Sequence, residues 1–114
     1  MHEVSLVASL VDRITEVAAR EGFSRVIKIR LRVGALSGVE PLALEFCFSE
    51  VVKGSVLEGA NLEIERVAPE LICARCGFVS TPEDAADLYC AHCRSGEIEV
   101  RRGREFNVVD LDVV

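Results

Sequence analysis

Two Cys-x-x-Cys pairs are the clearest candidates for chemistry in this 114-residue sequence, and residues 77–89 separate them. Two residues between paired cysteines let a tight turn aim both thiolates at one ion, and four thiolates suit the tetrahedral geometry of Zn²⁺. A site closed by four thiolates leaves no open position for a substrate, which indicates a structural role. The predicted zinc ligands are Cys73, Cys76, Cys90 and Cys93.

Two other chemistries use similar cysteine spacing. A dithiol redox site needs only one pair, placed near a βαβ unit, so the doubling of the pair disfavours it. An iron–thiolate electron carrier needs apolar cover, and the aromatic residues of the segment are few, Phe78 and Tyr89. The visible absorption of the purified protein distinguishes iron from zinc.

The first three residues, Met1, His2 and Glu3, form a second candidate metal site. A free α-amine, the next two backbone nitrogens and an imidazole are all nitrogen donors. Adjacent backbone nitrogens form small chelate rings that press a metal toward a plane, and planar nitrogen geometry selects Ni²⁺ or Cu²⁺ over Zn²⁺. The alternative is that His2 is a solvated surface residue, as most histidines near a terminus are.

Chelation by the terminus leaves one coordination question open. The nitrogens of Met1, His2 and Glu3 occupy three corners of a plane, and the fourth corner lies opposite the His2 amide. The His2 ring closes a short chelate with that same amide, so it lies beside the amide and not opposite. Met1 therefore leaves the plane, or the coordination number rises, or a remote donor completes the site. His92 is the other histidine of the chain and a candidate auxiliary ligand, unless it is simply exposed near the zinc turn.

Two amphipathic helices are expected to position these sites. Apolar residues at helical spacing predict a helix over residues 3–21, which Gly22 ends, and a second over residues 40–53. Pro41 suits the first turn of the second helix. Cys47 lies within that helix, where a free cysteine packs as a small hydrophobe.

Alternating apolar and polar residues predict three strands, over residues 25–33, 61–68 and 106–113. The residues expected to face inward are Ile27, Ile29, Leu31 and Val33 in the first, Leu62 and Ile64 in the second, and Val109, Leu111 and Val113 in the third. The outer face of the first strand is basic, whereas the outer faces of the other two are acidic. Because opposite charges on facing strands favour pairing, we expect the basic strand to lie between the acidic two.

These elements predict an α+β fold with two helices packed on a three-stranded sheet. The cysteine segment comes before the last strand of the sheet. We therefore expect residues 70–104 to form a four-cysteine zinc-ribbon subdomain inserted into the other domain. The other domain, which carries the nickel candidate, comprises residues 1–69 and 105–114. Zinc binding, at about 10–16 kcal/mol, would replace the core that so small a subdomain lacks.

Composition excludes several classes of function. The net charge of −6, with acids spread along the chain, argues against a nucleic-acid partner, although Arg101, Arg102 and Arg104 form one small basic patch. Neither a membrane-spanning window nor an export signal is evident, so the cytosol is the expected compartment and no membrane partner is expected. The sequence contains neither a nucleophile–base arrangement nor a phosphate loop, so we do not expect an enzyme. The competing hypothesis is a zinc-ribbon module that binds nucleic acid or another partner without transferring nickel.

Several motifs occur together in one order: the Met-His-Glu opening, the loop from Val33 to Glu40, the helix around Phe46 and Phe48, and the two cysteine pairs. Over essentially the whole chain they resemble the HypA/HybF family of hydrogenase-maturation nickel chaperones. The zinc pairs are shared with many ribbons, whereas their combination with the Met-His-Glu opening is much more specific.

The resemblance implies a metallochaperone that is not an enzyme. It implies transient Ni²⁺ binding by Met1, His2 and Glu3 and structural zinc on the four cysteines. It further implies that the protein helps to insert nickel into the large subunit of [NiFe]-hydrogenase. The implied partners are that subunit, a HypB-type GTPase and, in some organisms, urease maturation factors.

Overall fold

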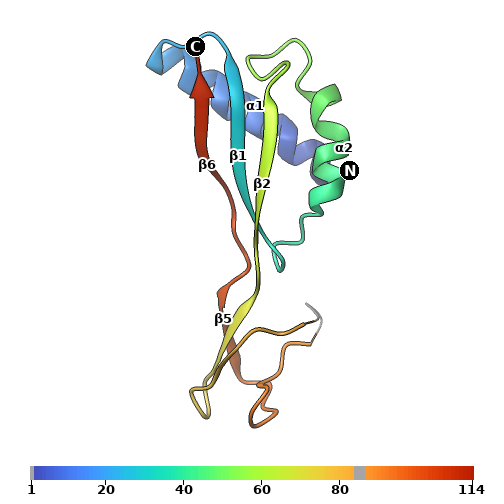
Figure 1. The fold of residues 1–114 in the computed structure, drawn as a ribbon, viewed down its shortest axis with the longest axis vertical. Coiled ribbons are helices and arrows are strands. Elements are labelled where there is room, and N and C mark those ends of the chain that lie inside the picture. The colour runs from blue at the N-terminus through green and yellow to red at the C-terminus, as the bar shows by residue number, and fades with distance from the viewer. Residues whose placement is uncertain (1, 84–86) are drawn as a thin grey trace.

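The computed structural model describes residues 2–83 and 87–114, and it shows an elongated molecule with a β-sheet at each end (Figure 1). Its principal extents are 53 × 26 × 17 Å. One end contains helices α1 (His2–Glu21) and α2 (Pro41–Val51) and strands β1 (Val26–Gly34), β2 (Asn61–Val67) and β6 (Phe106–Val113). The other end contains strands β3 (Glu70–Cys73), β4 (Val79–Ser80) and β5 (Ile98–Arg102).

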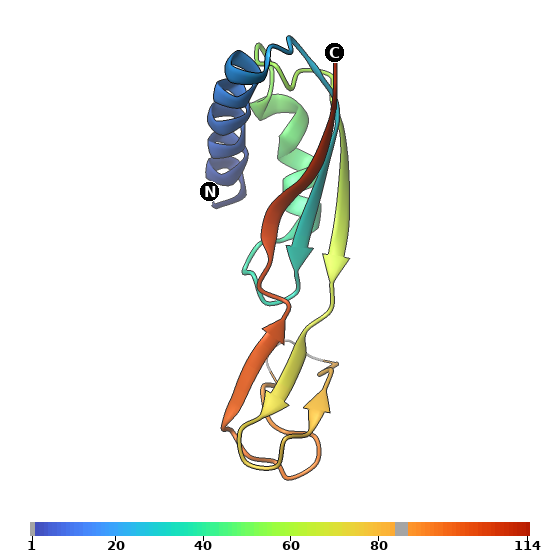
Figure 2. The same ribbon diagram turned by 90° about the vertical axis from the view of Figure 1, so that its left-hand side faces the viewer.

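Both helices cover the same face of the first sheet (Figure 2). The strand order is β2-β1-β6, with β1 parallel to β2 and antiparallel to β6. The parallel pair is joined through α2, as a parallel connection requires a crossover. This arrangement confirms the predicted fold of two helices on a three-stranded sheet, and neither helix has the length and hydropathy of a membrane span.

The basic strand lies between the two acidic strands, as its charges predict. Arg30 joins both neighbours, since its guanidinium lies 3.0 Å from Glu63 on β2 and 2.6 Å from Asp110 on β6. Lys28 also contacts Glu63, with 2.7 Å between the Lys28 Nζ and a carboxylate oxygen. Each of these side chains is partly exposed, so the pairs specify the strand order more than they add stability.

The core fills the space between the helices and the first sheet. Its buried side chains come from α1, β1, α2 and the segment after α2: Val7, Leu10, Ile14, Val26, Ile29, Leu31, Val33, Leu44, Phe48, Val52 and Leu57. Cys47 is partly buried and packs against this cluster as a small hydrophobe, with its Sγ 3.7 Å from the Leu44 carbonyl oxygen, so it lies at the edge of the core.

The alternation rule assigned two residues, Ile27 and Val109, to the wrong face. Ile27 is 42% exposed, because the β1–β6 register shifts between Val26 and Lys28 and places Val26 in the core instead. Val113 is 41% exposed, but it pairs directly with buried Val26 and so lies on the inner face, as predicted. Val109 is also exposed. A second register shift falls beside Val109, and an extra residue in one strand moves the following side chains to the opposite face.

The end of β1 and the residue after it bind the chain where it leaves the first sheet and where it returns. The Ala35 N–H donates to the carbonyl oxygen of Val67, the last residue of β2, at 2.9 Å. The Gly34 N–H donates to the Glu105 carbonyl oxygen at 2.7 Å, on the connection from β5 to β6. Gly103 packs against Pro69 across these connections, and its φ of +114° and the close backbone leave no room for a Cβ atom.

Candidate metal centre

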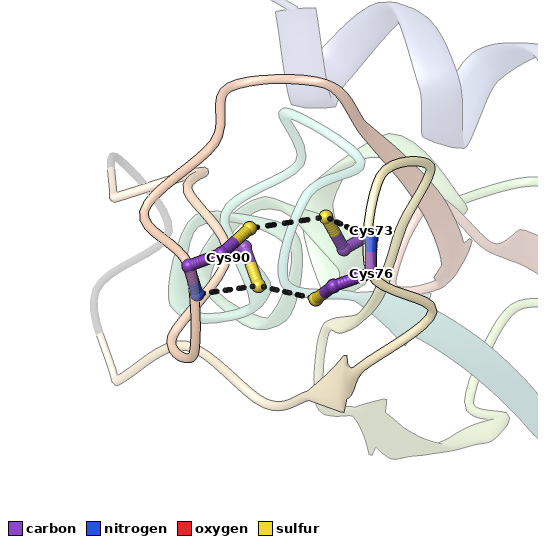
Figure 3. A group of neighbouring side chains, drawn as sticks. Cys73, Cys76 and Cys90 are labelled. Carbon is purple, nitrogen blue, oxygen red and sulfur yellow. Dashed lines mark hydrogen bonds between the residues drawn. The ribbon is translucent and has the colours of Figure 1, made fainter.

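The four predicted zinc ligands converge beside the end of β3, and Figure 3 labels three of them, Cys73, Cys76 and Cys90. Their Sγ atoms all lie within 4.8 Å of one another. Cys73 and Cys93 are separated by 3.6 Å between sulfur atoms, and Cys76 and Cys90 by 3.5 Å. Zn–S bonds of about 2.3 Å in a tetrahedron place sulfur atoms about 3.8 Å apart, so this donor set fits zinc.

Backbone N–H groups point at the first sulfur of each pair. The N–H groups of Arg75 and Cys76 lie 3.3 and 3.4 Å from the Cys73 Sγ. In the second turn, the N–H groups two and three residues after Cys90 both lie 3.3 Å from its Sγ. The two turns therefore repeat one geometry, which positions the thiols and stabilises negative charge on sulfur.

Each turn ends in a residue with left-handed backbone geometry. Gly77 has φ 75° and donates its N–H to the Cys73 carbonyl oxygen at 2.9 Å. Arg94 has φ 63° and makes the same bond, also at 2.9 Å, to the Cys90 carbonyl oxygen. Glycine adopts this conformation without a steric penalty, whereas arginine does not, so the closure of the cluster holds Arg94 in place.

The thiols ionise unequally before a metal binds. The Cys76 N–H lowers the pKa of the Cys73 thiol, and the Cys93 N–H lowers that of the Cys90 thiol to about 6. For Cys76, a hydrogen bond from the Phe78 N–H lowers the pKa, but desolvation and the neighbouring thiols outweigh it and raise the pKa to about 12. Four thiolates this close repel one another, so full ionisation requires a cation between them.

His92 lies on the surface of the second turn. Its ring stacks on Phe78, with 5.4 Å between ring centroids and 26° between planes. The four-cysteine group of the described residues does not include it. The turn belongs to the second sheet, at the other end of the molecule from α1 (Figure 1), so the role of His92 as an auxiliary nickel ligand stays a prediction.

The predicted nickel site lies at the start of α1. Met1 falls outside the described residues, His2 is exposed and Glu3 is half-buried. The first N–H groups of a helix have no partner within the helix, so the amide nitrogens of His2 and Glu3 stand outside the helical hydrogen-bond pattern.

The carboxylate of Glu3 connects the starts of the two helices. Its Oε2 accepts a hydrogen bond of 3.2 Å from the Glu40 N–H, which lowers the pKa of Glu3. Glu40 in turn caps α2, because its Oε1 accepts from the Leu42 N–H at 3.2 Å. Sequence reasoning missed this contact, although the Glu40-Pro41 pair marks a helix start where unpaired N–H groups are expected.

Two helices on a mixed sheet, joined to a small sheet with four convergent cysteines beside it, define a small α+β protein with a cysteine group that can hold a metal ion. A family model described as "Hydrogenase/urease nickel incorporation, metallochaperone, hypA" matches residues 1–113, and the chain therefore belongs to the HypA family. This confirms the resemblance found in the sequence motifs.

Curated relatives and solved structures agree with this assignment. The hydrogenase maturation factor HypA of Chlorobium limicola is 39% identical over 114 residues, which cover 99% of this chain and 97% of that protein. The HypA of Rhodobacter capsulatus is 37% identical, with both chains fully covered. A solution structure of the nickel metallochaperone HypA from Helicobacter pylori has the same fold, with a TM-score of 0.70, 24% identity and coverage of 98% and 97%. These relatives are named as maturation factors or metallochaperones and not as enzymes.

Proposed function

We propose that this chain binds Ni²⁺ as cargo at its N-terminus, through Met1, His2 and Glu3, and assists its insertion into the large subunit of [NiFe]-hydrogenase. The observation that carries the proposal is the open first turn of α1, which begins at His2. The amide nitrogens of that turn have no helical partners, so a metal competes for them with protons, with water and with the bond from the Glu3 N–H to its own carboxylate.

Nickel capture in this mode requires a local change in α1. Chelate rings between successive backbone nitrogens need a near-planar N–Cα–C–N arrangement, whereas the helical ψ is about −42°. The first turn therefore unwinds as nickel binds, and two amide protons leave. The apparent affinity accordingly falls steeply as the pH is lowered, by up to about a hundredfold per pH unit if both protons are displaced.

In this account Glu3 contributes its backbone nitrogen to nickel, while its carboxylate has a separate task. The bond from the Glu40 N–H to the Glu3 carboxylate supports this division, because it directs the carboxylate toward α2. The tether keeps the terminus beside α2 while the turn before it rearranges.

The four cysteines hold Zn²⁺ as a structural ion in this proposal. Their thiolates supply all four positions of a tetrahedral site, so zinc contributes folding free energy and no open site for a substrate. A terminal site with few fixed ligands releases nickel by ligand exchange, whereas the closed cysteine site does not. The two metals thus have separate sites and separate roles.

Membership of a hydrogenase maturation family implies contact with the maturation machinery. Within that machinery, the partners that we propose are a HypB-type GTPase and the large hydrogenase subunit, with urease maturation factors as further partners in organisms that have urease. The proposed compartment is the cytoplasm, where these assemblies form and where metal-binding cysteines stay reduced.

A calorimetric Ni²⁺ titration of the zinc-loaded protein at neutral pH tests the proposal. Both His2→Ala and a short N-terminal extension are expected to abolish tight binding, because each removes or displaces terminal donors. His92→Ala is the matched control, since it removes the other histidine and should leave the affinity unchanged. Tight binding that survives both terminal changes would refute the proposed site.

A further inference from the structure

Helix α2 presents two large apolar side chains to solvent. Leu42 is 63% exposed and Phe46 is 87% exposed. They lie four residues apart and so occupy the same helix face. The opposite face of α2 buries Leu44 and Phe48 in the core, so the exposed pair contributes little to folding.

A single exposed apolar residue is ordinary in a globular protein, whereas two large, highly exposed side chains side by side on one helix call for an explanation. Among the described residues, Phe46 is the most exposed of the large apolar side chains. Phenylalanine is a poorer helix former than alanine, lysine or glutamate, so it confers no local advantage at a solvent-facing position. Contiguous exposed apolar residues on a helix mark interaction surfaces.

Acidic residues flank this pair. Helical spacing places Glu45 on one side of the Leu42–Phe46 line and Glu50 on the other. Lys53 compensates only Glu50, with 3.0 Å between the Lys53 Nζ and a carboxylate oxygen. The described residues offer no ion-pair partner to Glu45. We name the surface formed by Leu42, Phe46 and these two acidic flanks the α2 stripe.

The size of the α2 stripe indicates the kind of occupant. Leu42 and Phe46 together expose on the order of 300 Å² of apolar surface. A stable complex buries about 800 Å² on each partner, so a second copy of this chain held by the stripe alone would not form a stable dimer. A transient partner needs less area and relies on a few anchor residues in the centre of the contact.

We propose that the α2 stripe docks a transient protein partner that presents an apolar pocket rimmed by lysine or arginine. A protruding aromatic side chain such as Phe46 acts as an anchor when it fills a partner's pocket. The acidic flanks, Glu45 and Glu50, then match basic side chains at the rim and accelerate association at low salt.

The stripe lies beside the proposed nickel terminus. Leu42 donates its N–H to the Glu40 carboxylate, and the Glu40 N–H donates to the Glu3 carboxylate, with 3.2 Å in each bond. The start of α1 therefore lies next to the start of α2. A protein docked on the stripe therefore lies within reach of the terminus. That this partner exchanges nickel rests on the proposed function.

The test measures binding of this chain to two purified probes, the HypB-type GTPase and the immature large subunit, and measures nickel affinity in parallel. Phe46→Ser is expected to weaken binding of the recognised probe at least tenfold, and Glu45→Lys to weaken it severalfold and flatten its salt dependence. Tyr89→Ser, which alters a 53% exposed side chain in the segment between β4 and β5, is the matched control and should leave binding of the probe unchanged. Nickel affinity should be the same in all of these proteins.

The outcomes separate this inference from the function on which it rests. If the unaltered protein does not bind nickel, the proposed function itself is refuted. Nickel binding with no binding of either probe, or with Phe46→Ser binding as tightly as the unaltered protein, would overturn the docking surface alone. Self-association seen by sedimentation and lost in Phe46→Ser would assign the stripe to a second copy of the chain. Adsorption to lipid vesicles that depends on Phe46 would assign it to a lipid surface. Either result would overturn the proposal.

Discussion

At the scale of single residues, the metal centre depends on backbone geometry as much as on the cysteines themselves. Spacing alone predicted which four thiols converge, because two intervening residues allow only a tight turn. The left-handed Arg94 could not be predicted, since its conformation follows from closure of the cluster and not from its own preference. The contact between Glu3 and Glu40 was equally invisible, because it joins a side chain to a backbone group far along the sequence.

Glu63 gives a pH-dependent prediction at this scale. Hydrogen bonds from Lys28 and then Arg30 lower its pKa below 4.5, the usual value for a glutamate. Because the folded-state pKa is the lower one, the stabilisation is complete above the unfolded-state value and is lost as the pH falls through the folded pKa. Urea unfolding between pH 3 and 7 should show a steeper acid loss for the unaltered protein than for Glu63→Gln. Glu16→Gln, at a site with no ion pair among the described residues, should keep the steep profile, and identical profiles for all three would contradict the assignment.

At the scale of elements, charge and periodicity predicted the order of the strands better than they predicted which side chains face the core. The charges of Arg30, Glu63 and Asp110 specified the strand order, because side chains of opposite charge on neighbouring strands attract each other. The alternation rule failed at Ile27 and Val109, beside register shifts. An extra residue in a strand leaves no local signal in the apolar pattern, so the rule cannot detect it.

Helix α2 provides a matched pair of substitutions, since Phe46 and Phe48 lie on opposite faces. Phe48→Ala should cost about 3–5 kcal/mol of unfolding free energy, because it opens a cavity in the core. Phe46→Ala should change stability by less than about 0.5 kcal/mol, because its side chain is exposed. Urea unfolding measures both. Similar losses for the two variants would mean that Phe46 packs within the folded chain, and the α2 stripe would not be a free surface.

At the scale of the whole molecule, one loop joins the two ends. The backbone bonds of Gly34 and Ala35 reach the end of β2 and the segment before β6. The loop that follows leads to Glu40, whose N–H bonds to Glu3 at the start of α1. Such contacts between backbone groups depend on three-dimensional proximity, so no residue type announces them in the sequence. We propose that residues 70–104 nonetheless form a zinc-dependent folding unit, because the fully buried residues of the second sheet are few.

Removal of zinc tests this division. A strong chelator should unfold β3, β4 and β5 while α1, α2 and the first sheet keep their structure, because the core between them contains no metal ligand. Amide resonances from residues 70–104 should then collapse to unfolded positions, whereas those of residues 2–69 and 105–114 stay dispersed. Simultaneous loss of both sets would show that the two parts fold as a single unit.

The central claim is that nickel and zinc occupy separate sites made of different donors. X-ray absorption at the nickel and zinc edges of the doubly loaded protein tests it most directly. We expect nitrogen and oxygen neighbours around nickel and four sulfur neighbours around zinc, because the terminus offers nitrogen donors and the second sheet offers thiolates. Thiolate sulfur around nickel, with zinc displaced from the protein, would contradict the account.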